Sequence, residues 1–304
     1  MLKRVALLAL LMHGAVSAAP PSEVARSTAK YARSTYGEQV ITSLSSMVSY
    51  NTVADPKLPL ESNPQHIGFK KFLGEEARRL GFDFTDAGYV VVIGYGKSKE
   101  RVGIITHGDV QPVDASKWKQ SPFKLDRTSE PGKLIGRGTE DDKGPIATAL
   151  YAMKAIKDRN VKLNKRIELY VYMAEESDWG PLEQYLKTHT PPQVNITIDA
   201  EYPVVTAEKG WGALTLTLPP VPAVPTQGPV LSEFTGGFFG SQIPEDAVAI
   251  IDNATPALAA QVKARGESQK GMRYTFEWEG QRLRVKAQGL AAHSSKPEDG
   301  VNAI

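Results

Sequence analysis

Apolar runs alternate with amphipathic segments through the first two thirds of the chain. Nearly continuous apolar runs, typical of strands buried on both faces, occupy residues 89–93 and 102–106, and two further strands are expected over residues 167–173 and 194–198. Amphipathic spacing and small-residue faces predict helices over residues 40–48, 67–80, 143–156 and 181–186. Strands that alternate with helices in this way predict an α/β fold, with a mostly parallel sheet and helices on both faces.

The pattern changes after Asp199. Residues 219–229 are rich in proline and predict no helix. Beyond them we expect a strand, a helix and a final pair of strands, over residues 247–251, 256–265, 274–278 and 282–287. The last two strands are joined across Glu279-Gly280, which predicts a hairpin. With a boundary near Glu201, we expect one domain over residues 20–200 and a smaller α+β domain over residues 201–304.

The first 19 residues resemble a secretory signal peptide. Lys3 and Arg4 precede an apolar run over residues 5–12, and Val16-Ser17-Ala18 supplies the small residues of a cleavage site. This run is far shorter than the roughly 20 residues that span a bilayer. We therefore expect a periplasmic or secreted protein that has no membrane segment after cleavage of residues 1–19.

Charge and cysteine content restrict the classes of function that the chain can have. Without Lys3 and Arg4 the chain has 34 basic and 34 acidic residues, so no electrostatic field for nucleic acid is expected. Cysteine is absent, which excludes thiolate sites and a cysteine nucleophile. Any metal must therefore be held by Asp, Glu and His side chains. The sequence has five histidines, His13, His66, His107, His189 and His293, and His13 lies in the expected signal peptide.

The most informative stretch is the turn over residues 136–144, Gly-Arg-Gly-Thr-Glu-Asp-Asp-Lys-Gly. Its three adjacent acidic residues repel one another unless a cation or hydrogen-bond donor stabilises them. The alternative is a solvated acidic turn that complements the dipole of the following helix. Other strand ends favour the metal site, because three apolar runs also finish in acids, with sequences Thr106-His107-Gly108-Asp109, Ala174-Glu175-Glu176 and Ile198-Asp199.

The residue types suggest distinct roles. Asp109 follows His107 by two positions and can hold the imidazole ring in the tautomer that binds metal. Asp141 has two carboxylate oxygens and can bridge two cations. Glu175 and Glu176 are adjacent, so in an extended chain they point to opposite sides. One can then bind metal while the other acts as a general base toward water; the alternative is a salt-bridged strand end.

Taken together, these motifs resemble those of the di-zinc exopeptidase and deacylase family. This family includes carnosine dipeptidases, bacterial broad-specificity dipeptidases, glutamate carboxypeptidases and acetylornithine deacetylase. Two later segments add to the resemblance, namely residues 236–246, with Ser241 where an Asn is usual, and residues 289–300, which contain His293. Residues 199–203 and the loop over residues 118–123 are most similar to the dipeptidase branch.

The resemblance implies a site for two zinc ions. One ion would be held by His107, Asp141 and Asp199, and the second by Asp141 and Glu176. It also implies further roles: Glu175 as the general base, Asp109 as the partner of His107, and His293 as a donor to the carbonyl oxygen. A cis peptide bond between Asp141 and Asp142 is expected as well, and the smaller domain is expected to act as a lid.

The family's second zinc takes a further histidine from a segment after the lid, whereas this sequence ends at Ile304. We therefore expect both domains to be incomplete, with one zinc held tightly and the second weakly. Co²⁺ or Mn²⁺ can replace zinc, since carboxylate-rich sites select weakly.

The expected function is metal-dependent hydrolysis of a dipeptide or similar small peptide, by a monomer or a homodimer formed through the lid. The alternatives are a weakly active or inactive metal- or peptide-binding relative, and an N-acyl amino-acid deacylase.

Overall fold

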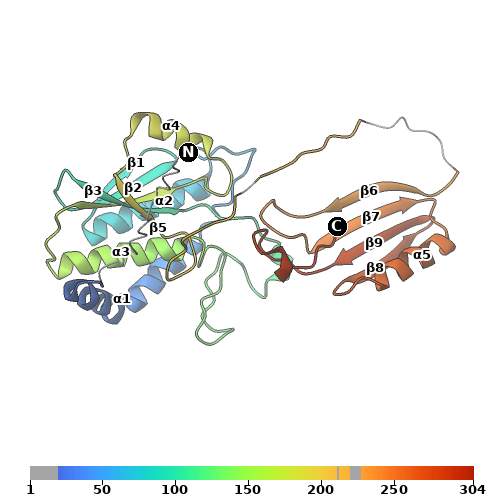
Figure 1. The fold of residues 1–304 in the computed structure, drawn as a ribbon, viewed down its shortest axis with the longest axis horizontal. Helices are drawn as coiled ribbons and strands as arrows, with labels where there is room; N and C mark the ends of the chain where they lie inside the picture. Colours follow the sequence, from blue (N-terminus) through green and yellow to red (C-terminus); the bar gives the residue numbers. More distant parts are fainter. Residues whose placement is uncertain (1–19, 211, 220–226) are drawn as a thin grey trace, which may run out of the picture. The chain divides into compact units, whose positions relative to one another are not determined.

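The computed structural model describes residues 20–210, 212–219 and 227–304. It divides into two compact units, Met1–Val204 and Val205–Ile304 (Figure 1). The expected signal peptide and most of the proline-rich stretch lie outside the described residues. The sequence suggested a domain boundary at Glu201, and the assignment of catalytic and lid roles to the two units stays a prediction.

The first unit is built on a five-stranded sheet of order β1-β2-β4-β3-β5. Its strands are β1 (Asp83–Asp86), β2 (Val90–Tyr95), β3 (Arg101–His107), β4 (Arg166–Tyr172) and β5 (Val194–Thr197). β3 is parallel to β4 and β5, whereas β2 is antiparallel to both of its neighbours. The α/β class is confirmed, and among the described strands of this sheet β2 alone runs against the others.

Helices cover both faces of this sheet, as expected (Figure 1). α2 (Pro64–Leu80) and α3 (Lys143–Asp158) bury one set of strand residues, and α1 (Glu23–Val48) packs on α3. Val91 and Leu169 belong to this core, while their neighbours Val90 and Tyr170 face α4 (Gly180–Thr188). This alternation is the two-residue period of a strand covered on both sides.

Two local signals fix the two ends of α2. Asn63 caps the first turn of α2 by accepting a hydrogen bond from the Gln65 N–H, and Gly81 ends it at φ 79°. The predicted extent of the helix at residues 40–48 is wrong, because these residues are only the end of the 26-residue α1.

None of the described helices carries an apolar stretch long enough to traverse a bilayer.

The second unit contains an antiparallel sheet of order β6-β7-β9-β8. Its strands are β6 (Val230–Gly236), β7 (Asp246–Asp252), β8 (Arg273–Glu279) and β9 (Arg282–Gln288), and α5 (Pro256–Glu267) packs on one face. β8 and β9 form the expected hairpin, closed by the pair Glu279 and Arg282. Two short 3₁₀ helices, η1 (Ala115–Lys117) and η2 (Pro297–Asp299), complete the elements.

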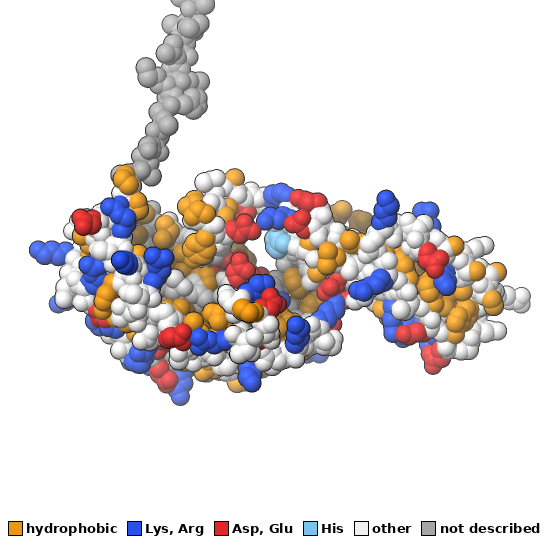
Figure 2. Space-filling model, turned by 90° about the horizontal axis from the view of Figure 1, so that it is seen from below, with side chains coloured by type: hydrophobic (Ala, Val, Ile, Leu, Met, Phe, Trp, Pro, Cys, Tyr) orange, Lys and Arg blue, Asp and Glu red, His pale blue; other side chains and the backbone are white. Residues whose placement is uncertain are grey.

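The surface carries both signs of charge. Figure 2 shows Lys and Arg side chains interspersed with Asp and Glu side chains over the face drawn. This distribution accords with the nearly equal numbers of basic and acidic residues in the sequence.

Candidate metal centre

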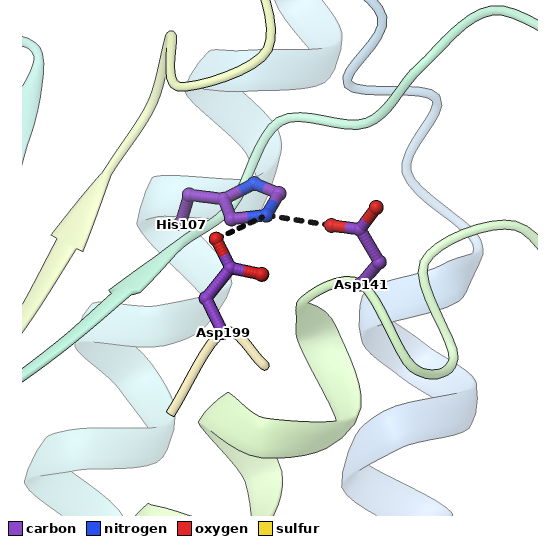
Figure 3. A group of neighbouring side chains, drawn as sticks. All are labelled: His107, Asp141 and Asp199. Atoms are coloured by element: carbon purple, nitrogen blue, oxygen red, sulfur yellow. Dashed lines mark hydrogen bonds and ion pairs between the residues drawn. The ribbon is translucent and has the colours of Figure 1, made fainter. Parts of the chain in front are cut away.

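His107 lies at the end of β3, with its side chain 1% exposed. Its Nε2 atom is 2.7 Å from Asp141 Oδ1 and 3.6 Å from Asp199 Oδ2 (Figure 3). Asp199 follows β5, which is parallel to β3, so the carboxyl ends of the two strands bring these residues to one edge of the sheet. One ligand atom from each of the three lies within 4.8 Å of the others.

Asp109 connects His107 to the turn after β4. Its side chain is fully buried, its backbone carbonyl oxygen is 3.1 Å from His107 Nδ1, and its Oδ1 is 3.4 Å from the same nitrogen. The carboxylate also accepts hydrogen bonds from the backbone N–H groups of Glu175 and Glu176, each at 3.0 Å. With Nδ1 held against Asp109, the ring directs Nε2 toward Asp141 and Asp199.

The chain turns after β4 and does not stay extended. The Asp178 N–H donates to the Ala174 carbonyl at 2.9 Å, and one ligand atom each of Glu175 and Glu176 lies within 4.8 Å of a His107 ring nitrogen. The expectation that the two glutamates point to opposite sides, as in a strand, is therefore wrong. The cause is Asp109, which accepts hydrogen bonds from two successive N–H groups.

Glu176 is the more constrained of the two glutamates. Its Oε2 accepts a hydrogen bond from Gln111 Nε2 at 2.7 Å. Its Oε1 is buried and has no hydrogen-bond partner among the described residues. A buried carboxylate oxygen without a donor is costly, and a cation would satisfy it.

The acidic turn before α3 separates its carboxylates. The Asp141-Asp142 peptide bond is cis, as expected. Asp142 is fully buried and accepts hydrogen bonds from the Thr106 hydroxyl and from the His107 N–H, the latter at 3.4 Å. Of the three acids, Asp141 alone joins the group around His107, with its side chain 51% exposed.

Burial and the repulsion between neighbouring carboxylates shift the pKa values of the groups in this cluster. Burial raises the pKa of Glu176 to about 8, and the nearby Asp141 charge adds to the increase. Burial also raises the pKa of Glu175. Burial lowers the pKa of His107, but its hydrogen bonds to Asp109, Asp141 and Asp199 reverse this effect and raise the pKa far above its usual range. The three carboxylates therefore stabilise a positive charge on the His107 ring.

The donor set fits a divalent metal ion such as zinc, which takes imidazole nitrogen and carboxylate oxygen. Two groups of donors are present among the described residues, one of His107, Asp141 and Asp199 and one of His107, Glu175 and Glu176. Both groups use the same histidine. The described residues therefore supply a single histidine-containing metal position.

The other three histidines of the described residues lie in neither group. His66 is buried in α2, and His189 stacks on Tyr185 at a centroid distance of 4.1 Å. His293 belongs to the second unit, where its Nδ1 is 2.7 Å from the Ser295 hydroxyl. Its role as a donor to the substrate stays a prediction.

The two later motifs of the sequence meet within the second unit. The Ile243 N–H donates to the Ala292 carbonyl, and the Ser294 N–H donates to the Ser241 carbonyl, both at 2.8 Å. The motif over residues 236–246 therefore holds the backbone on both sides of His293.

Sequence reasoning assigned no role to Gln111 or Thr106. Gln111 donates to Glu176, and Thr106 donates to Asp142. Thr106 directly precedes His107, and Gln111 follows Asp109 by two positions. A single amide or hydroxyl side chain has no periodicity or charge pattern that would reveal its partner.

Comparison with known proteins extends this picture. The model of Peptidase family M20/M25/M40 matches residues 103–293, a span that includes every candidate site residue. A Beta-Ala-Xaa dipeptidase from Lactobacillus delbrueckii subsp. lactis is 32% identical over 275 residues, which are 88% of this chain and 57% of that protein. The putative dipeptidase YtjP from Bacillus subtilis (strain 168) is 32% identical over 219 residues, covering 71% of this chain and 46% of that protein.

This chain spans about half the length of these curated relatives. Among solved structures, human carnosine dipeptidase 1 is 21% identical, with a TM-score of 0.46 over 55% of this chain and 38% of that chain. The family match covers well over half of the 304 residues. The chain therefore belongs to Peptidase family M20/M25/M40.

Proposed function

We propose that this chain carries the metal site of a dipeptidase, which hydrolyses the peptide bond of dipeptides or similar small peptides with a metal-activated water. The observation that carries the proposal is the convergence of Asp141 and Asp199 on His107 Nε2, beside the turn that holds Glu175 and Glu176. Family membership and the names of the curated relatives support it.

His107, Asp141 and Asp199 would hold one zinc ion, and Asp141 with Glu176 would contribute to a second position. When bound, zinc lowers the pKa of a water ligand and polarises the scissile carbonyl. Asp109 holds the Nδ1 side of the His107 ring, so that Nε2 is directed at Asp141 and Asp199. Gln111 holds one oxygen of Glu176 and leaves the other available.

Glu175 is the proposed general base. Burial raises its pKa, which makes the carboxylate a better proton acceptor near neutral pH. It would take a proton from the attacking water and then deliver it to the amine that leaves as the peptide C–N bond breaks. His293 is proposed as a donor to the carbonyl oxygen, a role that rests on the resemblance of its motif.

A metal-binding protein without turnover is the second candidate. It is favoured by the observation that both donor groups among the described residues depend on His107. An N-acyl amino-acid deacylase has less support, because the curated relatives quoted above are named as dipeptidases. Residues 1–19 support a periplasmic or secreted location.

The test is a substrate panel assayed with the zinc-loaded full chain. β-Alanyl dipeptides, α-dipeptides and N-acetyl amino acids are compared, with His107→Ala as the control for the site. We expect cleavage of dipeptides that is lost in His107→Ala. Cleavage of N-acetyl amino acids alone would favour the deacylase, and zinc binding without any cleavage would favour the binding protein.

A further inference from the structure

A short segment between α1 and α2 contacts the loop that contains Asp109 but provides no candidate ligand. Thr52 is fully buried, and its hydroxyl donates to the Gly108 carbonyl at 2.7 Å. Its own carbonyl accepts a hydrogen bond from the Val110 N–H at 3.2 Å. Thr52 therefore holds the chain on both sides of Asp109.

The same segment also holds the start of α3. The Tyr50 carbonyl accepts hydrogen bonds from Lys143 Nζ at 2.7 Å and from the Thr52 N–H at 3.0 Å. Lys143 is fully buried, and its Nζ lies 5.1 Å from the centre of the Phe69 ring. As the first residue of α3, it directly follows the Asp141-Asp142 pair.

We propose that Thr52 and Lys143 are positioning residues that set the separation of His107 and Asp141. This inference rests on the proposed metal site. The two ligands come from different elements, and residues 50–52 are hydrogen-bonded to the chain beside each of them. Because Thr52 and Lys143 are both fully buried, water cannot replace their hydrogen bonds.

Metal affinity is sensitive to such supporting contacts, and loss of an outer partner typically weakens binding by about 10- to 100-fold. Thr52→Val keeps the shape of the side chain but removes the hydroxyl donor. Lys143→Met keeps most of the length but removes the ammonium. We expect each variant to bind zinc at least about 10-fold more weakly than the unmodified chain.

The experiment is a zinc titration of the full chain against a competing chelator, with zinc alone as the probe and no activity assay. Thr52→Ser retains the hydroxyl and should restore the affinity. Thr28→Val is the matched control, because Thr28 is also buried but its hydroxyl has no partner among the described residues. It should bind zinc as the unmodified chain does.

A second readout separates positioning from general stability. The visible absorption of the Co²⁺-loaded protein depends on the geometry of the ligands, and it should change in Thr52→Val and Lys143→Met but not in Thr28→Val. Thermal unfolding followed by circular dichroism reports whether each variant is folded.

The inference is overturned if Thr52→Val and Lys143→Met melt earlier yet keep the affinity and the Co²⁺ spectrum. In that case a loss of zinc in His107→Ala would still support the metal site. If His107→Ala binds zinc as well as the unmodified chain, the proposed site itself is wrong and the inference is overturned with it.

Discussion

Asp109 makes contacts to both sides of the candidate site, since it lies against the His107 ring and accepts the N–H groups of Glu175 and Glu176. Asp109→Asn would place an amide donor against one of these N–H groups. We expect zinc affinity to fall by about 10- to 100-fold, measured by competition with a chelator. Asp114→Asn, at an exposed loop position, is the control. Equal affinities for the two variants would contradict the role of Asp109.

Glu175 can be distinguished from a metal ligand by substitution with glutamine. If Glu175 is the base, the Glu175→Gln variant should keep its zinc. Its rate of dipeptide hydrolysis should fall by about 100-fold or more, because a neutral amide cannot accept the proton. The measurement pairs metal analysis with dipeptide turnover. Glu183→Gln, in the first turn of α4, should change neither quantity. Loss of zinc from Glu175→Gln would make Glu175 a ligand.

The raised pKa of Glu176 predicts pH-dependent metal binding. Burial and Asp141 raise the pKa to about 8, so below that pH the metal-free carboxyl carries a proton that must leave when metal binds. Affinity for the second zinc position, to which Glu176 would contribute, should therefore increase from pH 6 to about 8 more steeply in the unmodified chain than in Glu176→Gln. Loss of a proton from His107 contributes the same pH dependence of zinc affinity in both proteins. Equal slopes in the two titrations would contradict this role.

At the scale of the elements, sequence periodicity identified those that face a core. The segments β2, β4, α2 and α3 have continuous or periodic apolar residues that are buried in the first unit, whereas in β3 Ile104 is half-buried and Ile105 is 41% exposed. Three features were not predicted: β1, β6 and the first part of α1. β1 and β6 are mostly exposed, and Thr28 is the only buried residue in α1 before Ser43. An element that buries few apolar side chains leaves no periodic pattern in the sequence.

The end of α2 offers a test of an element boundary. Gly81 and Gly88 both have positive φ, at 79° and 83°. A side chain at either position costs about 1–2 kcal/mol. A methyl group at Gly81 would also displace Lys157 Nζ from its hydrogen bonds to the Leu80 and Gly81 carbonyls, whereas Gly88 has open space. Gly81→Ala should therefore lower the urea midpoint more than Gly88→Ala, and the reverse order would contradict the account.

At the scale of the whole molecule, the α/β class followed from the alternation of apolar runs with helical segments, and the residues around His107 from acids at the ends of those runs. The convergence of β3 and β5 could be expected because parallel neighbours end at one edge. The turn after β4 could not, because Asp109 enforces it from 66 residues away in the sequence. Nor could the pairing of Ser241 with Ser294, which depends on how the second unit packs.

The most direct test of the central claim is the zinc content of the full chain after dialysis. Only His107 provides a nitrogen ligand among the described donor groups. The account therefore predicts about one tightly held zinc per chain, lost in His107→Ala. His189→Ala should keep it, since His189 belongs to neither donor group. Retention of zinc by His107→Ala would contradict the proposed metal centre.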